Sequence, residues 1–348
     1  MRWSNENRRI WIRGIIATFA MFLIILDTGT AVRSAQEGIQ LCVRTVIPSL
    51  FPFFVLSGVI NSCLLGRRFR FLRPIGRLCR IPKGGESLLL LGFLAGYPIG
   101  AQLITQAYRD GRLSESTARR MLGFCNNAGP SFIFGMLSPL FSGIKTLWVL
   151  WLVQILSALI TGVILPAEPT SAIQLFPGKG ITFTESLQKA LKAIGGVCGW
   201  IVLFRVMIGF CTHWFFWLFP VSVQILISGV LELANGCVLL SNLSCEGMRF
   251  LLSGIFLSFG GLCVGMQTMS VTEGLGSGWY FPGKVLQTIL CVLLCLFLQP
   301  FLFVKSEAVI FTPSSLLALV LSLMICIFLL RRKKVVAFSG KLLYNTEN

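Results

Sequence analysis

The chain has 348 residues, of which 55% are hydrophobic and 12% are charged. Soluble globular domains carry roughly 25% charged residues, so this composition excludes a chain whose whole surface faces water. The formal net charge is +17, but the basic residues lie in short segments between apolar stretches, with no folded basic domain. Nucleic-acid binding is therefore disfavoured, and the charges are better used as signals of membrane topology.

Apolar stretches long enough to cross a membrane follow one another along the chain, since about 20 helical residues span ~30 Å of hydrocarbon. Two further apolar stretches, 87–108 and 221–241, contain glycines and polar residues near their middles, and each is expected to form a re-entrant hairpin. The predicted fold class is an all-α polytopic membrane protein with about eight transmembrane helices and these two hairpins. The predicted helices are 10–28, 40–62, 117–142, 146–165, 189–212, 248–271, 284–304 and 313–330.

The N-terminal apolar stretch has the basic and apolar regions of a signal peptide. We expect it to remain uncleaved, because the apolar run reaches the length of a membrane span by Thr28. The charged residues Asp27 and Arg33 near the possible cleavage site also disfavour cleavage by a signal peptidase. Residues 1–33 are thus a predicted N-terminal transmembrane helix. Residues 305–348 are predicted to form a C-terminal transmembrane helix and a basic cytoplasmic tail.

The basic loops predict the orientation. Residues 67–83 contain seven basic residues and no acidic one, which places this loop in the cytoplasm under the positive-inside rule. If 87–108 turns back within the membrane, the next basic segment is cytoplasmic too, and both termini lie on the same side. That segment contains Arg109, Arg112, Arg119 and Arg120.

An internal repeat is predicted from the alignment of residues 34–60 with residues 182–208. Glu37 then matches Glu185, and Gln40 matches Gln188, in both cases before an apolar helix. Each copy is followed by one of the predicted hairpins. We therefore expect two repeats, 34–165 with hairpin 87–108 and 182–304 with hairpin 221–241, in opposite orientations. Inverted repeats with discontinuous helices are a common plan of secondary transporters.

Four segments carry the candidate chemistry. In the first, Gly92, Gly96, Tyr97, Pro98 and Gly100 interrupt an apolar run, where unpaired backbone groups can line a polar cavity. The alternative is close helix packing through glycines at four-residue spacing. In the second, Asn126 and Asn127 precede Gly129 and Pro130. These asparagines can bind a polar solute or an ion, or they can join helices to one another through hydrogen bonds.

The other two segments lie in the second half. Glu232 stands beside Asn235 and Gly236 in an apolar run, and an intramembrane carboxylate is a functional candidate by default. Arg205 is its expected partner in a charge pair. The fourth segment combines glycines with one carboxamide, at Gly260, Gly261 and Gln267.

No catalytic or metal-binding pattern is present in the sequence. The chain lacks the common hydrolase, metalloprotease and nucleotide-binding motifs. It has one histidine, and its twelve cysteines are dispersed, with Cys291 and Cys295 the only pair at helical i, i+4 spacing. We expect no enzyme activity, no metal and no cofactor.

The four segments together resemble the YlbJ family of sporulation integral membrane proteins, over about residues 36–267. The family's G-[FY]-P-x-G-A hairpin is similar to Gly96 to Ala101, and its N-N/S-x-x-P-x-F-I-x-G element to Asn126 to Gly135. Its L-E-[LI]-x-x-G stretch is similar to Leu231 to Gly236, and its G-G-x-x-V-x-x-Q-like stretch to Gly260 to Gln267. The resemblance implies paired nucleoside recognition or gate domains, a bacterial cytoplasmic or forespore membrane, and involvement in spore cortex formation.

These observations lead to one functional hypothesis and one competitor. We expect a secondary transporter or gated pore that contacts membrane lipid and moves a small polar solute or ion, nucleoside-like by the resemblance. The competing interpretation is a non-transporting scaffold that recruits envelope-building proteins. The candidate binding residues are Gly96, Tyr97, Pro98, Gly100, Asn126, Asn127, Gly129, Pro130, Glu232, Asn235, Gly236, Gly260, Gly261 and Gln267.

Overall fold

A computed structural model describes residues 5–65, 67, 69–168 and 180–303, and these residues form helices and connecting loops without any β-strand. Five of the helices are long and apolar enough to cross a membrane, at Thr28–Leu64, Ile144–Ile164, Phe183–Trp214, Glu246–Val271 and Tyr280–Leu302. The predicted all-α, multi-pass membrane class is therefore confirmed for the described residues. The predicted last span, 313–330, lies outside them.

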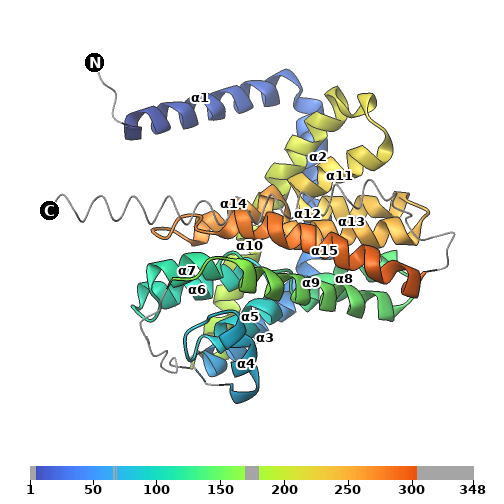
Figure 1. Ribbon diagram of the computed structural model, residues 1–348. Helices are drawn as coiled ribbons and strands as arrows, with labels where there is room; N and C mark the ends of the chain where they lie inside the picture. The colour runs from blue at the N-terminus through green and yellow to red at the C-terminus, as the bar shows by residue number, and fades with distance from the viewer. Residues whose placement is uncertain (1–4, 66, 68, 169–179, 304–348) are drawn as a thin grey trace, which may run out of the picture.

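The helices follow one another with short connections (Figure 1). A five-residue π turn, Cys42–Val46, joins α2 to α3 without breaking the helix. The helices are α1 (Asn5–Leu26), α2 (Thr28–Leu41), α3 (Ile47–Leu64), α4 (Arg73–Leu78), α5 (Glu86–Ala95), α6 (Ile99–Arg109), α7 (Glu115–Met121), α8 (Pro130–Met136), α9 (Ile144–Ile164), α10 (Phe183–Trp214), α11 (Val221–Leu231), α12 (Leu233–Leu239), α13 (Glu246–Phe259), α14 (Gly261–Val271) and α15 (Tyr280–Leu302).

The same order of elements occurs twice after α1. A long helix comes first, then a pair of short helices, then an interrupted helix, and then a second long helix. In the first half these are α2–α3, the pair α5 and α6, the pair α7 and α8, and α9. In the second half they are α10, the pair α11 and α12, the pair α13 and α14, and α15. Both stretches predicted as hairpins, 87–108 and 221–241, thus contain two short helices separated by a break.

Two of the predicted continuous spans are interrupted. The stretch 117–142 contains the short helices α7 and α8, separated by turn and extended residues up to Gly129, because Pro130 cannot continue a helix from the preceding turn. The stretch 248–271 is divided at Gly260, whose left-handed φ of +81° ends α13 before α14 begins at Gly261. These breaks expose backbone groups in the middle of apolar segments.

The two longest helical segments, α2–α3 and α10, pack against each other in an antiparallel arrangement. Ser34 lies against Gly209, and Ser186 lies against Gly58, where it donates a hydrogen bond to the carbonyl of Val55 at 2.6 Å. A serine near the start of each segment therefore meets a glycine near the end of the other. At 1.5 Å per residue these segments are about 55 and 48 Å long, so they must tilt or project beyond ~30 Å of hydrocarbon.

A second group of helices, α9, α13 and α15, lies side by side across the view of Figure 1. Buried carboxamides join them: Gln154 donates to the carbonyl of Leu257 at 3.2 Å, and Gln299 donates to that of Gly247 at 2.9 Å. Cys291 and Cys295 pack against Gly254, as small apolar side chains would. The group thus joins the last long helix of the first half to the second half, while α1 extends away from the rest of the molecule (Figure 1).

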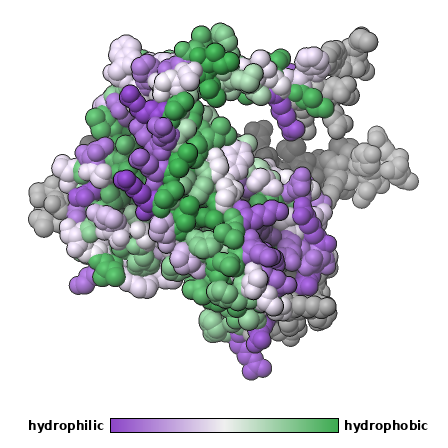
Figure 2. Space-filling view, turned by 180° about the vertical axis from the view of Figure 1, so that it is seen from behind, coloured by the Kyte–Doolittle hydropathy of each residue, from purple (hydrophilic) through white to green (hydrophobic). Residues whose placement is uncertain are grey.

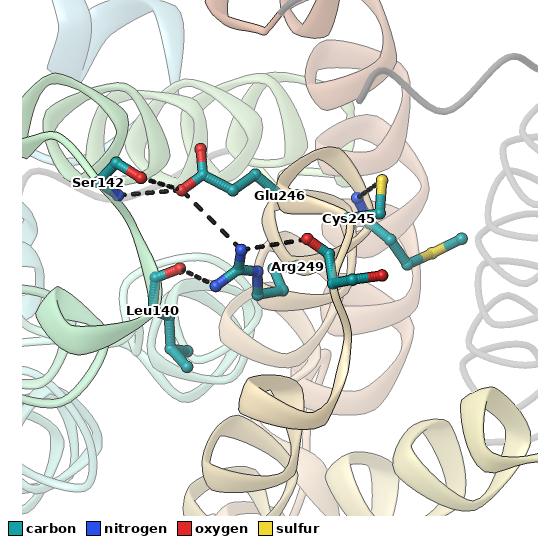
Figure 3. A network of polar contacts seen from close by, with 7 residues as sticks. Leu140, Ser142, Cys245, Glu246 and Arg249 are labelled. Atoms are coloured by element: carbon teal, nitrogen blue, oxygen red, sulfur yellow. Dashed lines mark hydrogen bonds and ion pairs between the residues drawn. The ribbon is translucent and has the colours of Figure 1, made fainter. Parts of the chain in front are cut away.

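Polar contacts fasten the interrupted helices of the two halves, or the segments that directly follow them, to one another. Figure 3 shows one of them, in which Glu246 accepts hydrogen bonds from the backbone and hydroxyl of Ser142 at 3.0 and 2.6 Å. Arg249 in the same network donates to the carbonyl of Leu140 at 2.7 Å. Farther along, the guanidinium of Arg119 donates to the carbonyl of Leu275 at 2.9 Å.

Arg120 is buried inside the protein and is not a solvated residue of a basic loop. Its side chain donates hydrogen bonds to the carbonyl of Cys79 at 2.7 Å and to those of Gly162 and Leu165 at the end of α9. It therefore stabilises a helix C-terminus, where a cation is favoured.

Large apolar side chains are exposed on the described surface, and Figure 2 shows hydrophobic side chains covering continuous areas of one face.

Candidate functional site

The tip of the first hairpin fits closely against the gap between α7 and α8. Gly96 has a φ of +78°, and a Cβ atom added there would lie 2.8 Å from the backbone nitrogen of Gly129. A Cβ atom added at Gly92 would lie 1.9 Å from the carbonyl oxygen of Cys125. Larger residues would push the two segments apart. The broken helix and the close packing through glycines, which we treated as alternatives, both occur here.

The second hairpin is built in a similar way around Glu232, which separates α11 from α12. Its buried carboxylate accepts hydrogen bonds from the backbone of Ala234 at 2.9 Å and of Asn235 at 2.7 Å, and from the Asn235 carboxamide at 2.7 Å. A Cβ atom added at Gly261 would lie 3.2 Å from the backbone nitrogen of Leu233. In both halves, then, the hairpin tip packs against the break of the interrupted helix that follows it.

Both hairpin tips, the break of the first interrupted helix and α14 of the second meet at one small cavity of about 30 Å³. It is closed on the remaining sides by α3 and α10. The hydroxyl of Tyr97 is buried and has no hydrogen-bond partner among the described residues. The polar or flexible groups that line the cavity are Gly96, Tyr97, Gly129, Ser131, Glu232 and Gln267.

The predicted site residues divide into two groups. Gly96, Tyr97, Gly129, Glu232 and Gln267 line the cavity. The others are not among its lining residues. This second group consists of Pro98, Gly100, Asn126, Asn127, Pro130, Asn235, Gly236, Gly260 and Gly261.

Asn126 and Asn127 join helices to one another. Asn126 accepts a hydrogen bond from the backbone of Ala101 at 3.3 Å and donates one to the hydroxyl of Thr268 at 3.0 Å. Asn127 accepts hydrogen bonds from the ammonium of Lys284 at 2.9 Å and from the carboxamide of Gln287 at 2.8 Å. Each asparagine thus ties the first interrupted helix to the second half.

Lys284 is a residue whose importance sequence reasoning missed. It stands at the start of a predicted span, where a lysine ordinarily extends to the membrane interface. In the structure its side chain is fully buried, and its ammonium donates to Asn127 and to Gln287 at 3.0 Å. A signal was available: Gln287 follows Lys284 by one helical turn, which is typical of two polar side chains on one buried helix face.

The predicted charge pair between Arg205 and Glu232 is not among the ion pairs of the described residues. Arg205 pairs instead with Glu37 of α2, whereas Glu232 is satisfied by the N-terminal groups of α12. The helix packing explains the difference, because Arg205 of α10 lies directly against α2 at Gly38. Glu232 is left facing the cavity without an ion-pair partner among the described residues.

One comparison with known proteins relates this chain to a curated protein. It is 32% identical, over 129 residues, to the sporulation integral membrane protein YlbJ of Bacillus subtilis (strain 168). The matched region covers 35% of this chain and 31% of that protein, so the chain spans about a third of the length of the relative. No family model matches the chain, and no solved structure matches it.

Proposed function

We propose that this protein is a secondary transporter or gated pore for a small polar solute or ion, built as an inverted repeat. The observation that carries the proposal is the buried carboxylate of Glu232, which faces a cavity lined by residues of all four candidate segments. Two discontinuous helices and two hairpin tips that meet at one point are the arrangement by which transporters form a midplane binding site. The reciprocal contacts of Ser34 and Ser186 support the repeat.

The size of the cavity restricts what it holds in this conformation. A volume of about 30 Å³ accommodates one or a few water molecules or a small dehydrated ion. A nucleoside-sized solute needs a pocket of roughly 300 Å³ or more. A solute of that size therefore requires the hairpin tips to separate, whereas a small cation or a proton fits beside Glu232 in the cavity as it stands.

The similarity to the sporulation protein YlbJ supports a role in endospore formation, at the bacterial cell membrane or the forespore membrane. The basic loops support cytoplasmic N- and C-termini. We extend the proposal to formation of the spore cortex, through supply or removal of a small polar solute. A nucleoside-like solute is the first to be tested.

Uptake by proteoliposomes tests the proposal. Purified protein should accumulate at least one solute from a panel of labelled nucleosides, nucleobases, small organic anions and monovalent cations, several times faster than empty liposomes do. A preset ion gradient should change the initial rate if transport is coupled. Absence of uptake for the whole panel, in either direction of the gradient, would favour the scaffold interpretation, in which Asn126 and Asn127 have only their observed role in joining helices.

Cysteine labelling from one side of the membrane tests the first hairpin. Lys83 precedes α5 and Arg109 ends α6, and both are exposed. If the hairpin turns back, Lys83→Cys and Arg109→Cys should both react with an impermeant reagent applied to the cytoplasmic side. Labelling of the two positions from opposite sides would show that the stretch crosses the membrane and would remove the inverted repeat.

A further inference from the structure

A second and larger cavity lies between α3, α6 and α10. Its volume is about 460 Å³, within the range of pockets that hold small organic molecules. Carboxamides from two helices line it, Asn61 from α3 and Gln102 and Gln106 from α6, together with Lys189 from α10. None of these residues was singled out by the sequence motifs.

The polar groups of this cavity indicate the chemistry of its ligand. The Oδ1 atom of Asn61 is buried and has no hydrogen-bond partner among the described residues. A buried acceptor of this kind is costly unless a water or a ligand donates to it. Asp110 and Arg112, at the rim, form an ion pair of 3.5 Å. Lys189 is exposed and has no ion-pair partner within the described part of the chain, so Asp110, Arg112 and Lys189 together give the lining one negative and two positive charges, a net formal charge of +1.

Phe54 of α3 lines this cavity and also the central cavity that contains Glu232. Its side chain is buried, with 4% of its surface exposed. Phe54 therefore belongs to the walls of both spaces. Leu50, one helical turn earlier, lines only the central cavity.

We propose that the cavity between α3, α6 and α10 is an access vestibule for a small polar organic solute with a negatively charged group, and that Phe54 is the barrier between this vestibule and the central cavity. Lys189 attracts the anionic group, and Asn61, Gln102 and Gln106 exchange hydrogen bonds with the polar remainder. This inference rests on the proposed transport function, for which it supplies the substrate class and the gate.

The charge preference is tested by measuring how fast Gln102→Cys reacts with an anionic and with a cationic methanethiosulfonate reagent. The reaction is followed by intact mass, and the protein without that cysteine gives the background. The anionic reagent should react faster than the cationic one. Adding Lys189→Gln should lower the ratio of the two rates about tenfold, because it removes a positive charge that lines the same cavity as the thiol. Lys83→Gln, outside the vestibule, is the matched control. A ratio that is unchanged by Lys189→Gln would overturn the anionic assignment.

The barrier is tested with Ser131→Cys, which lies in the wall of the central cavity. Its reaction with the same anionic reagent should be slow, and Phe54→Ala should accelerate it about tenfold or more. Leu50→Ala, which also removes a large side chain, should have a much smaller effect. Equal acceleration by the two alanines would reject Phe54 as the barrier.

The labelling does not depend on transport, so the two proposals fail separately. If the protein takes up a solute but neither Lys189→Gln nor Phe54→Ala changes the thiol reaction rates, the protein is a transporter with a different access route. If the thiol reaction rates change as expected but no solute is taken up, the protein has a gated binding pocket and does not transport.

Discussion

Replacing Asn127 by leucine should lower the free energy of unfolding by about 3–5 kcal/mol, because it removes the acceptor of one buried hydrogen bond from a charged group and of another from a carboxamide. The ammonium of Lys284 would lose its bond to Asn127, and the carboxamide of Gln287 would lose its bond to the same oxygen. Both groups are fully buried, so water cannot replace the lost acceptor. Thermal unfolding of the purified protein in detergent measures the effect.

Two further variants make this prediction specific. Asn126→Leu removes neutral hydrogen bonds only, to Ala101 and Thr268, and should cost about 1–3 kcal/mol. Adding Lys284→Met to Asn127→Leu should recover a large part of the loss, because the unpaired charge is then removed with its acceptor. If Asn126→Leu destabilises the protein as much as Asn127→Leu does, the buried lysine is not what makes Asn127 important.

Glu232→Gln should reduce the initial rate of solute uptake at least tenfold while leaving a folded protein. The substitution removes the negative charge that faces the central cavity, so it weakens binding of any cation or hydrogen-bond donor there. It also replaces one acceptor oxygen by an NH2 group that would meet the backbone of Ala234 or the two donors of Asn235. The loss of stability should be about 1–3 kcal/mol.

Glu246→Gln is the matched control for uptake. Glu246 is also a carboxylate at the start of a helix of the second half, but its contacts are with Ser142 and Arg249 and not with the cavity. This variant should retain most of the transport. Full activity of Glu232→Gln, at a protein amount equal to that of the unaltered chain, would exclude Glu232 from the mechanism.

Local breaks were predictable because the residues that cause them act within one turn. Gly96 with Pro98 marks the first hairpin tip, and the polar Glu232 marks the second, and both positions separate two helices in the structure. Gly129 with Pro130 likewise indicates a break in the helix. The length and hydropathy of 117–142 nevertheless predict a continuous span, because together they match a membrane crossing.

Long-range pairing was not predictable in the same way. Arg205 and Glu37 are 168 residues apart, and their pairing follows from the antiparallel packing of α10 on α2, which no local pattern specifies. Arg120 and Lys284 lie near the ends of predicted spans, where basic residues are usually solvated. In the structure each is buried among acceptors supplied by other helices. Burial of a charge depends on neighbours that only the tertiary structure supplies.

The fastening of the two interrupted helices has a mechanical consequence. Arg119 with Leu275, Asn126 with Thr268, and Ser142 with Glu246 bind them at three successive levels. Such a block should move as a single rigid body, so any alternation between inward- and outward-facing states must shear along another boundary. The seam between α3, α10 and the first hairpin is the natural slip plane, since both hollow spaces of the molecule border it.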